Sequence, residues 1–188
     1  MESDPASIPI EIIQGNSLIV RLGEEKRLQR AYVSSERILL SYLQWISLQN
    51  GKFLWATSLR LSPQKLRKVD NFILYTPESD LSLCSKIVDT GSPWNASDKR
   101  WIEDNEYLPV LDLPETKRIW IKCGEGRPVR INPADYQLQH AKNGKHESLL
   151  KMYEDSDKAP YQYVEVIPEL RKAKDMKTEG GKGGKACR

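Results

Sequence analysis

The chain has 188 residues, of which 39% are hydrophobic and 29% are charged. A chain of this length can bury one good core, and the composition is typical of a soluble globular protein, which excludes a wholly disordered one. The longest apolar-leaning run, residues 38–48, is interrupted by Ser41, Gln44 and Ser47. It is also shorter than the roughly 20 residues of a membrane-spanning helix, so we expect no membrane partner.

The net charge is +3, and most of it is concentrated near the end of the chain. From residue 168 onward there are seven basic and three acidic residues, a balance of +4, so the rest of the chain carries about −1. This pattern predicts a single α+β domain over residues 1–170 and a flexible, basic, Lys- and Gly-rich tail over residues 171–188. A globally basic nucleic-acid-binding surface is excluded, whereas a local basic patch is not.

Two features favour a reducing compartment. The first residues are acidic and interrupted by Pro5 and Pro9, unlike the basic and then apolar start of a secretory signal, so we expect a cytoplasmic protein. Cys84, Cys123 and Cys187 are odd in number and widely spaced, which favours reduced thiols over a disulfide framework or a zinc site. We expect neither a metal nor a cofactor.

The N-terminal part of the chain predicts a hairpin followed by a helix. Residues 8–22 contain two β-branched runs joined at Gly15-Asn16, a turn sequence typical of hairpins. Ser34 is a suitable N-cap, and the apolar residues between 38 and 46 recur at helical spacing. Asn50-Gly51 would end this helix.

The middle of the chain predicts strands and a short helix. Residues 52–61 indicate a strand, and residues 62–68 indicate a helical turn that begins at Ser62-Pro63. Residues 72–75 and 81–88 indicate two strands joined by a turn-rich connection of hairpin length. A polar loop over residues 89–100 follows.

The remaining elements complete a mostly β pattern. Further strands are expected at residues 110–113, 118–123, 128–131 and 161–167. Gly124-Glu125-Gly126 separates the strand at 118–123 from the strand at 128–131. A helix is expected near residues 148–153. The whole predicts an α+β fold, a mostly antiparallel curved sheet or small β-barrel with one or two packed helices.

Enzymatic motifs are missing from the sequence. The only histidines, His140 and His146, lie in a polar segment, where solvated side chains are commoner than metal ligands. The usual zinc-protease, serine-hydrolase and dinucleotide-binding motifs do not occur. Cys84 lies in an apolar strand and is better explained as a small core residue than as a nucleophile. We therefore expect no catalytic residue, and a binding protein in preference to an enzyme.

Aromatic and basic residues coincide near the middle of the chain. Trp94 and Trp101 fall in a polar loop, and Lys99-Arg100 lies between them. Residues 60–68 add four cations and no acid. Loop aromatics beside cations are suited to base stacking and phosphate contacts, although a solvated helix face explains residues 60–68 almost as well.

Residues 66–94 also resemble the central segment of the PUA-like superfamily, and in particular its EVE-type branch. The matching pieces are Trp55, Leu66, Val69-Asp70, Phe72, Leu74, Tyr75, Cys84, Val88 and Pro93. The resemblance implies a small curved barrel that binds RNA or DNA, often through a modified base in an aromatic-lined pocket. Carried onto this sequence, it implies pocket residues Trp55, Tyr75, Trp94 and Trp101 and backbone contacts Arg67, Lys68, Lys99 and Arg100.

Two hypotheses of different classes follow for the function. The first is a non-enzymatic nucleic-acid-binding module that recognises a modified or flipped base by aromatic stacking. The second is a protein-interaction or structural-assembly component, encoded by a phage or another mobile element, which the nearly neutral body favours. An enzyme built from scattered carboxylates is a third class, which would require two of them to face each other in a cleft.

Overall fold

The fold is described from a computed structural model, which describes residues 8–22, 25–27, 31–57, 59–77, 81–91, 119–140, 145–155 and 160–171. The strands are β1 (Ser17–Arg21), β2 (Glu25–Arg27), β3 (Ala31–Val33), β4 (Phe53–Thr57), β5 (Asn71–Tyr75), β6 (Leu81–Gly91), β7 (Ile119–Arg130), β8 (Tyr136–Leu138) and β9 (Tyr161–Val166). The helices are α1 (Ser35–Leu48), α2 (Pro63–Leu66), the 3-10 turn η3 (Pro133–Asp135) and α4 (Leu149–Asp155).

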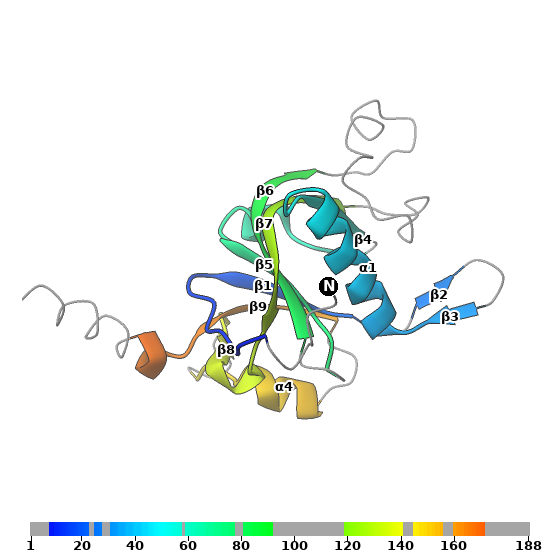
Figure 1. Ribbon diagram of the computed structural model, residues 1–188. Coiled ribbons are helices and arrows are strands. Elements are labelled where there is room, and N and C mark those ends of the chain that lie inside the picture. Colours follow the sequence, from blue (N-terminus) through cyan, green and yellow to red (C-terminus); the bar gives the residue numbers. More distant parts are fainter. Residues whose placement is uncertain are drawn as a thin grey trace, which may run out of the picture.

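Seven of the strands form one mixed sheet in the order β4-β7-β6-β5-β1-β9-β8. β1 and β5 are parallel, and the other neighbouring pairs in this sheet are antiparallel. The predicted α+β class with a mostly antiparallel sheet is therefore confirmed. The predicted small β-barrel is wrong, because a barrel requires its two edge strands to pair, and here β4 and β8 remain at opposite edges. Strands β2 and β3 form a separate pair that projects from the body (Figure 1).

Hydrophobic residues cover both faces of this sheet, because successive side chains of a strand point to opposite faces. In β1, Leu18 and Val20 join a core under α1, whereas Ile19 joins a second core on the other face. The second core includes Ile13 from the N-terminal segment and Leu149 from α4. Figure 1 shows α1 and α4 on opposite sides of the sheet. The central strands are therefore buried on both faces, and their near-continuous apolar sequences reflect this.

Helix α1 forms where the sequence predicts it. The Ser34 side chain accepts a hydrogen bond from the Arg37 amide at 3.3 Å, as an N-cap does. The residues that face the sheet recur at helical spacing and are buried: Ile38, Leu39, Tyr42 and Ile46. Asn50 and Gly51 have φ angles of 50° and 78°, which end the helix in the left-handed region.

The hairpin predicted for residues 8–22 is wrong. β1 pairs with β5 and β9, and the segment before it contacts β7 through an isolated bridge between Ile10 and Arg130. The Gly15-Asn16 turn is instead held by Asp70, whose carboxylate accepts from the Asn16 amide at 3.0 Å. The Asn16 carbonyl accepts in return from the amides of Asp70 and Asn71. A turn signal alone cannot show that its hydrogen bonds go to a segment more than 50 residues away.

β7 is one long strand where the sequence predicts two. It runs through Gly124, Glu125 and Gly126, and the register with β6 shifts there. Glu125 has a φ of 54°, so the extra residue is absorbed in a bulge and the strand continues. The Gly126 amide donates to the Gly51 carbonyl at 2.7 Å, which joins the bulge to the end of α1.

Most other predicted elements are found at their expected places. These are the strands β4, β5, β6 and β9 and the helices α2 and α4. The loop predicted for residues 89–100 begins too early, because β6 continues to Gly91. Residues 92–100 of that loop lie outside the described residues, as do the predicted strand at residues 110–113 and the tail from residue 172 onward. Among the described residues, no helix combines the length and the apolar character needed to cross a membrane.

The Gly51–Gly126 contact leads to a stability prediction. A Cβ at Gly126 would lie 2.8 Å from the Gly51 carbonyl oxygen, which as a backbone atom cannot rotate away. We expect Gly126→Ala to lower the free energy of unfolding by about 2 kcal/mol, measured by urea denaturation. Gly124→Ala is the matched control, because its Cβ would meet only a Val88 methyl group at 3.1 Å. Equal losses in the two variants would contradict the prediction.

Candidate functional site

A cluster of exposed cations lies around α2. We call it the α2 surface and define it by the cations Arg60, Lys65, Arg67 and Lys68, together with the adjoining His140. No described carboxylate forms an ion pair with these four Lys and Arg side chains. The acid that follows, Asp70, accepts its hydrogen bond from the Asn16 backbone. The α2 surface is therefore a local positive region on a nearly neutral protein.

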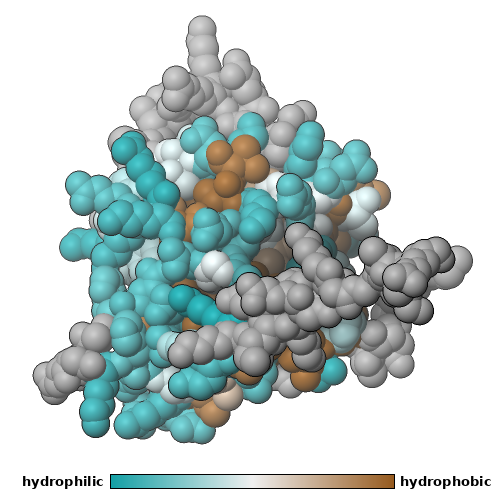
Figure 2. Space-filling view, turned by 90° about the vertical axis from the view of Figure 1, so that its left-hand side faces the viewer, coloured by the Kyte–Doolittle hydropathy of each residue, from teal (hydrophilic) through white to brown (hydrophobic). Residues whose placement is uncertain are grey.

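The chain around α2 is anchored so that these cations point outward. Leu61 and Leu66 are 5% and 1% exposed and belong to the core under α1. Pro63 begins the helix, where a proline is well accommodated. With the apolar positions turned inward, the basic positions between and after them face solvent. Figure 2 shows the side of the molecule that lies on the left in Figure 1, and hydrophilic residues make up most of its coloured surface.

Lys65 connects α2 to the far edge of the sheet. Its ammonium lies 2.7 Å from Nε2 of His140 and 5.5 Å from the ring centre of Tyr163 in β9. Tyr161 stands perpendicular to Tyr163 at 6.1 Å, and its hydroxyl donates to the Arg60 carbonyl at 3.1 Å. Burial raises the pKa of Tyr163 to about 12, so its ring is neutral at physiological pH. Cations and tyrosine rings are therefore packed together at this surface.

The sequence-predicted site residues divide into three groups. Arg67 and Lys68 are exposed on the α2 surface. Trp55 is 7% exposed and packs in the core under α1, with its ring 5.0 Å from that of Phe72. Tyr75 is 5% exposed and belongs to the core on the other face of the sheet. Trp55 and Tyr75 therefore do not line a common pocket.

The remaining predicted residues, Trp94, Lys99, Arg100 and Trp101, lie outside the described residues. Their proposed contacts with a base and with phosphates stay predictions. Sequence reasoning missed three residues that adjoin Lys65 or Arg60, namely His140, Tyr161 and Tyr163. The alternation of polar and apolar residues at 161–167 predicted a strand, but nothing in it indicated which segment would cover the tyrosines.

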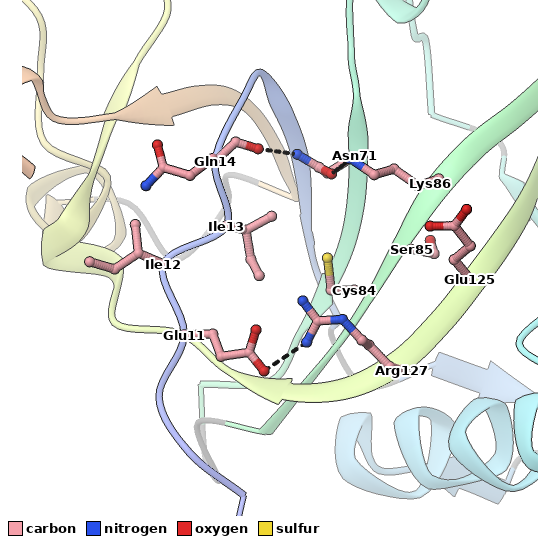
Figure 3. Close-up of a pocket in the computed structure, with 10 residues that line it drawn as sticks. All are labelled: Glu11, Ile12, Ile13, Gln14, Asn71, Cys84, Ser85, Lys86, Glu125 and Arg127. Carbon is pink, nitrogen blue, oxygen red and sulfur yellow. Dashed lines mark hydrogen bonds and ion pairs between the residues drawn. The ribbon is translucent and has the colours of Figure 1, made fainter. Parts of the chain in front are cut away.

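A separate hollow lies on the other face of the sheet (Figure 3). It is open to solvent, has a volume of about 340 Å³ and is lined by residues 11–14, β5, β6 and β7. Four charged side chains line it, Glu11, Lys86, Glu125 and Arg127. Glu11 accepts from Arg127 at 2.7 Å, and Lys86 donates to the Asn71 side-chain carbonyl at 2.7 Å. The hollow is polar, and several of its side chains are held by hydrogen bonds.

Cys84 lines this hollow but is poorly suited to act as a nucleophile. Burial raises the pKa of its thiol to about 11, and the nearby cations of Arg127 and Lys86 reduce that rise only in part. The thiol is therefore protonated at physiological pH, and the predicted assignment of Cys84 to the core is confirmed. Burial also raises the pKa of the Cys123 thiol, which lies in the core under α1. In the part of the chain that the structure describes, no three His, Cys, Asp or Glu side chains are grouped to hold a metal ion.

Comparisons of the chain with models of protein families, with curated proteins and with solved structures find no match. The resemblance to the PUA-like superfamily accordingly stays a prediction.

The raised pKa of Cys84 predicts slow alkylation. A shift from 9.0 to about 11 lowers the thiolate fraction at neutral pH about 100-fold, and the thiolate is the reacting species. We expect iodoacetamide to modify Cys84 at least 100-fold more slowly in the folded protein than in urea, measured by peptide mass spectrometry at pH 7.5. Similar folded and unfolded rates would show that the thiol is accessible and ionised.

Proposed function

We propose that this protein is a non-enzymatic nucleic-acid-binding protein, with the α2 surface contacting the phosphates of single-stranded RNA or DNA. The observation that carries the proposal is the set of four cations within residues 60–68, held outward by buried leucines and not paired with any described carboxylate. Cations without a carboxylate partner can bind phosphates without first breaking an ion pair, and the phosphates release their counterions.

The neighbouring tyrosines support a single-stranded ligand in preference to a duplex. Tyr161 is half-buried beside the exposed Arg60 and is fixed by its hydroxyl, so a part of its ring remains at the surface. Proteins that bind single strands combine a basic track with aromatic rings on which unpaired bases stack. Contacts to phosphates and stacking faces carry little sequence information, so we expect weak sequence preference from the α2 surface alone.

The proposal agrees with what a PUA-like resemblance would imply, but it does not use all of the residues that the resemblance implies. Of the predicted residues, it uses Arg67 and Lys68 as phosphate contacts. In this proposal Trp94 and Trp101 recognise a modified or flipped base by stacking on it. A separate experiment, given below, tests these two residues. Trp55 and Tyr75 take no part, because both are buried in the cores.

Charge reversal on the α2 surface tests the phosphate contacts. We expect Arg67→Glu with Lys68→Glu to weaken binding of a fluorescent single-stranded oligonucleotide at least tenfold, measured by fluorescence anisotropy. The dependence of log K on log salt should become shallower by about 0.7 for each phosphate that the protein no longer neutralises. Lys52→Glu with Lys151→Glu is the matched control, because both lysines are exposed elsewhere and two cations are likewise replaced by glutamate. An equal weakening in both double variants would show that the effect comes from net charge and not from the α2 surface.

Replacing the loop tryptophans tests base recognition separately. We expect Trp94→Ala with Trp101→Ala to weaken binding of the same oligonucleotide about tenfold or more, since stacking on one ring contributes about 1–3 kcal/mol. The salt dependence should stay unchanged, because no cation is removed. Unchanged affinity with an intact circular dichroism spectrum would remove these two residues from the proposal. If the native protein instead forms a stable assembly and shows no salt-sensitive binding, the protein-interaction class replaces the whole proposal.

A further inference from the structure

The hollow between residues 11–14 and β5, β6 and β7 is built from side chains with fixed positions. The Asn71 amide donates to the Gln14 carbonyl at 2.7 Å and to the Ser17 hydroxyl at 3.3 Å, and its oxygen accepts from Lys86. Next to Gln14, the Ile13 amide donates to the Tyr136 hydroxyl at 2.9 Å. These hydrogen bonds join four separate parts of the chain, so the hollow is formed before any ligand enters. Its volume of about 340 Å³ lies at the small end of ligand sites.

Two of its four charges neutralise each other and two do not. Arg127 and Glu11 form an ion pair at 2.7 Å. Lys86 bonds to the neutral Asn71, and no ion pair joins it to Glu125 or to another described carboxylate. Lys86 lies opposite Gly124 in the β6–β7 register, so Lys86 and Glu125 reach the hollow from neighbouring strands. One positive and one negative group are thus available to a ligand.

Glu125 holds a backbone conformation that a glycine would adopt more easily. Its φ of 54° lies in the left-handed region, which costs a residue with a Cβ about 1 kcal/mol. Glycines stand on both sides of it, at 124 and 126. The bulge itself therefore does not need a carboxylate at this position. A strained residue whose side chain lines a cavity points to a role for that side chain.

The apolar part of the hollow is small. Ile12, Ile13 and Cys84 line one side, and Figure 3 shows the Cys84 sulfur between Ile13 and Arg127. The same view shows Lys86 and Glu125 on the strands across from them. A short apolar group can therefore lie against Ile13 and Cys84 beside the two available charges.

We infer that this hollow binds a small zwitterion of the α-amino-acid class. The ligand carboxylate would bond to Lys86, and the ligand ammonium would bond to Glu125. Its short side chain would lie against Ile13 and Cys84. Binding involves no covalent step. A ligand with only one of the two charges would contact either Lys86 or Glu125 but not both, so we expect it to bind more weakly than the zwitterion.

The test uses the full chain with alanine, serine and threonine as probes, each at about 10 mM, in thermal unfolding and titration calorimetry. Ethylamine and propionate carry one charge each and are the matched ligand controls. We expect at least one amino acid to raise the melting temperature, and neither control to do so. If none of the amino acids changes the melting temperature or releases heat on binding, or if propionate alone acts as strongly, the inference is overturned.

Two variants place the binding in this hollow. Glu125→Gly removes the carboxylate and suits the left-handed backbone, so it should fold at least as well as the native chain. Lys86→Met removes the ammonium and keeps the length of the side chain. We expect each to weaken amino-acid binding at least tenfold, whereas Lys151→Met on α4 should leave it unchanged. Native affinity in the folded Glu125→Gly protein would contradict the inference. Oligonucleotide binding at the α2 surface should be unaffected by Glu125→Gly, which keeps the two proposals separable.

Discussion

The clasp between Gly15-Asn16 and Asp70-Asn71 fixes how the two halves of the sheet meet. Two amides donate to the Asn16 carbonyl, and the Asp70 carboxylate accepts from the Asn16 amide. Gly15 has a φ of 89°, and a Cβ there would lie 2.7 Å from the Asp70 carboxylate, so only glycine allows this approach. The clasp sets Ser17 opposite Asn71 and thereby fixes the register of the parallel β1–β5 pair. Parallel strands have no short turn to align them, so another interaction must do so.

Both proposed sites are positioned by this clasp. Lys68 lies just before it, and its carbonyl accepts from the Asn16 side chain at 3.2 Å, which connects the α2 surface to the start of β1. Asn71 is itself part of the clasp, and its side-chain carbonyl accepts from Lys86 in the hollow on the other face. One turn therefore supports both the cationic α2 surface and the hollow on the other face of the sheet. The two sites need not share a ligand, because their charges differ in sign and in arrangement.

Local signals predicted the local structure, and long-range contacts decided the rest. Helix α1 follows from Ser34, Gly51 and the spacing of apolar residues, and the β5–β6 hairpin follows from its connection length. Nothing near residues 8–22 indicates that β1 pairs with β5 and not with its own upstream segment. Exposed cations at Arg67 and Lys68 could be predicted from composition. The tyrosines of β9 and His140 could not be placed beside them, because only the sheet order brings them there.

A sheet that is buried on both faces also limits how the molecule can open. β1 has a strand on each side and a core above and below, so its amides have no route to solvent through local fraying. Deuterium would reach the amides of Leu18, Ile19 and Val20 only when the whole domain unfolds. The exchange rates of these three amides thus report the free energy of global unfolding, independently of the α2 surface and of the hollow.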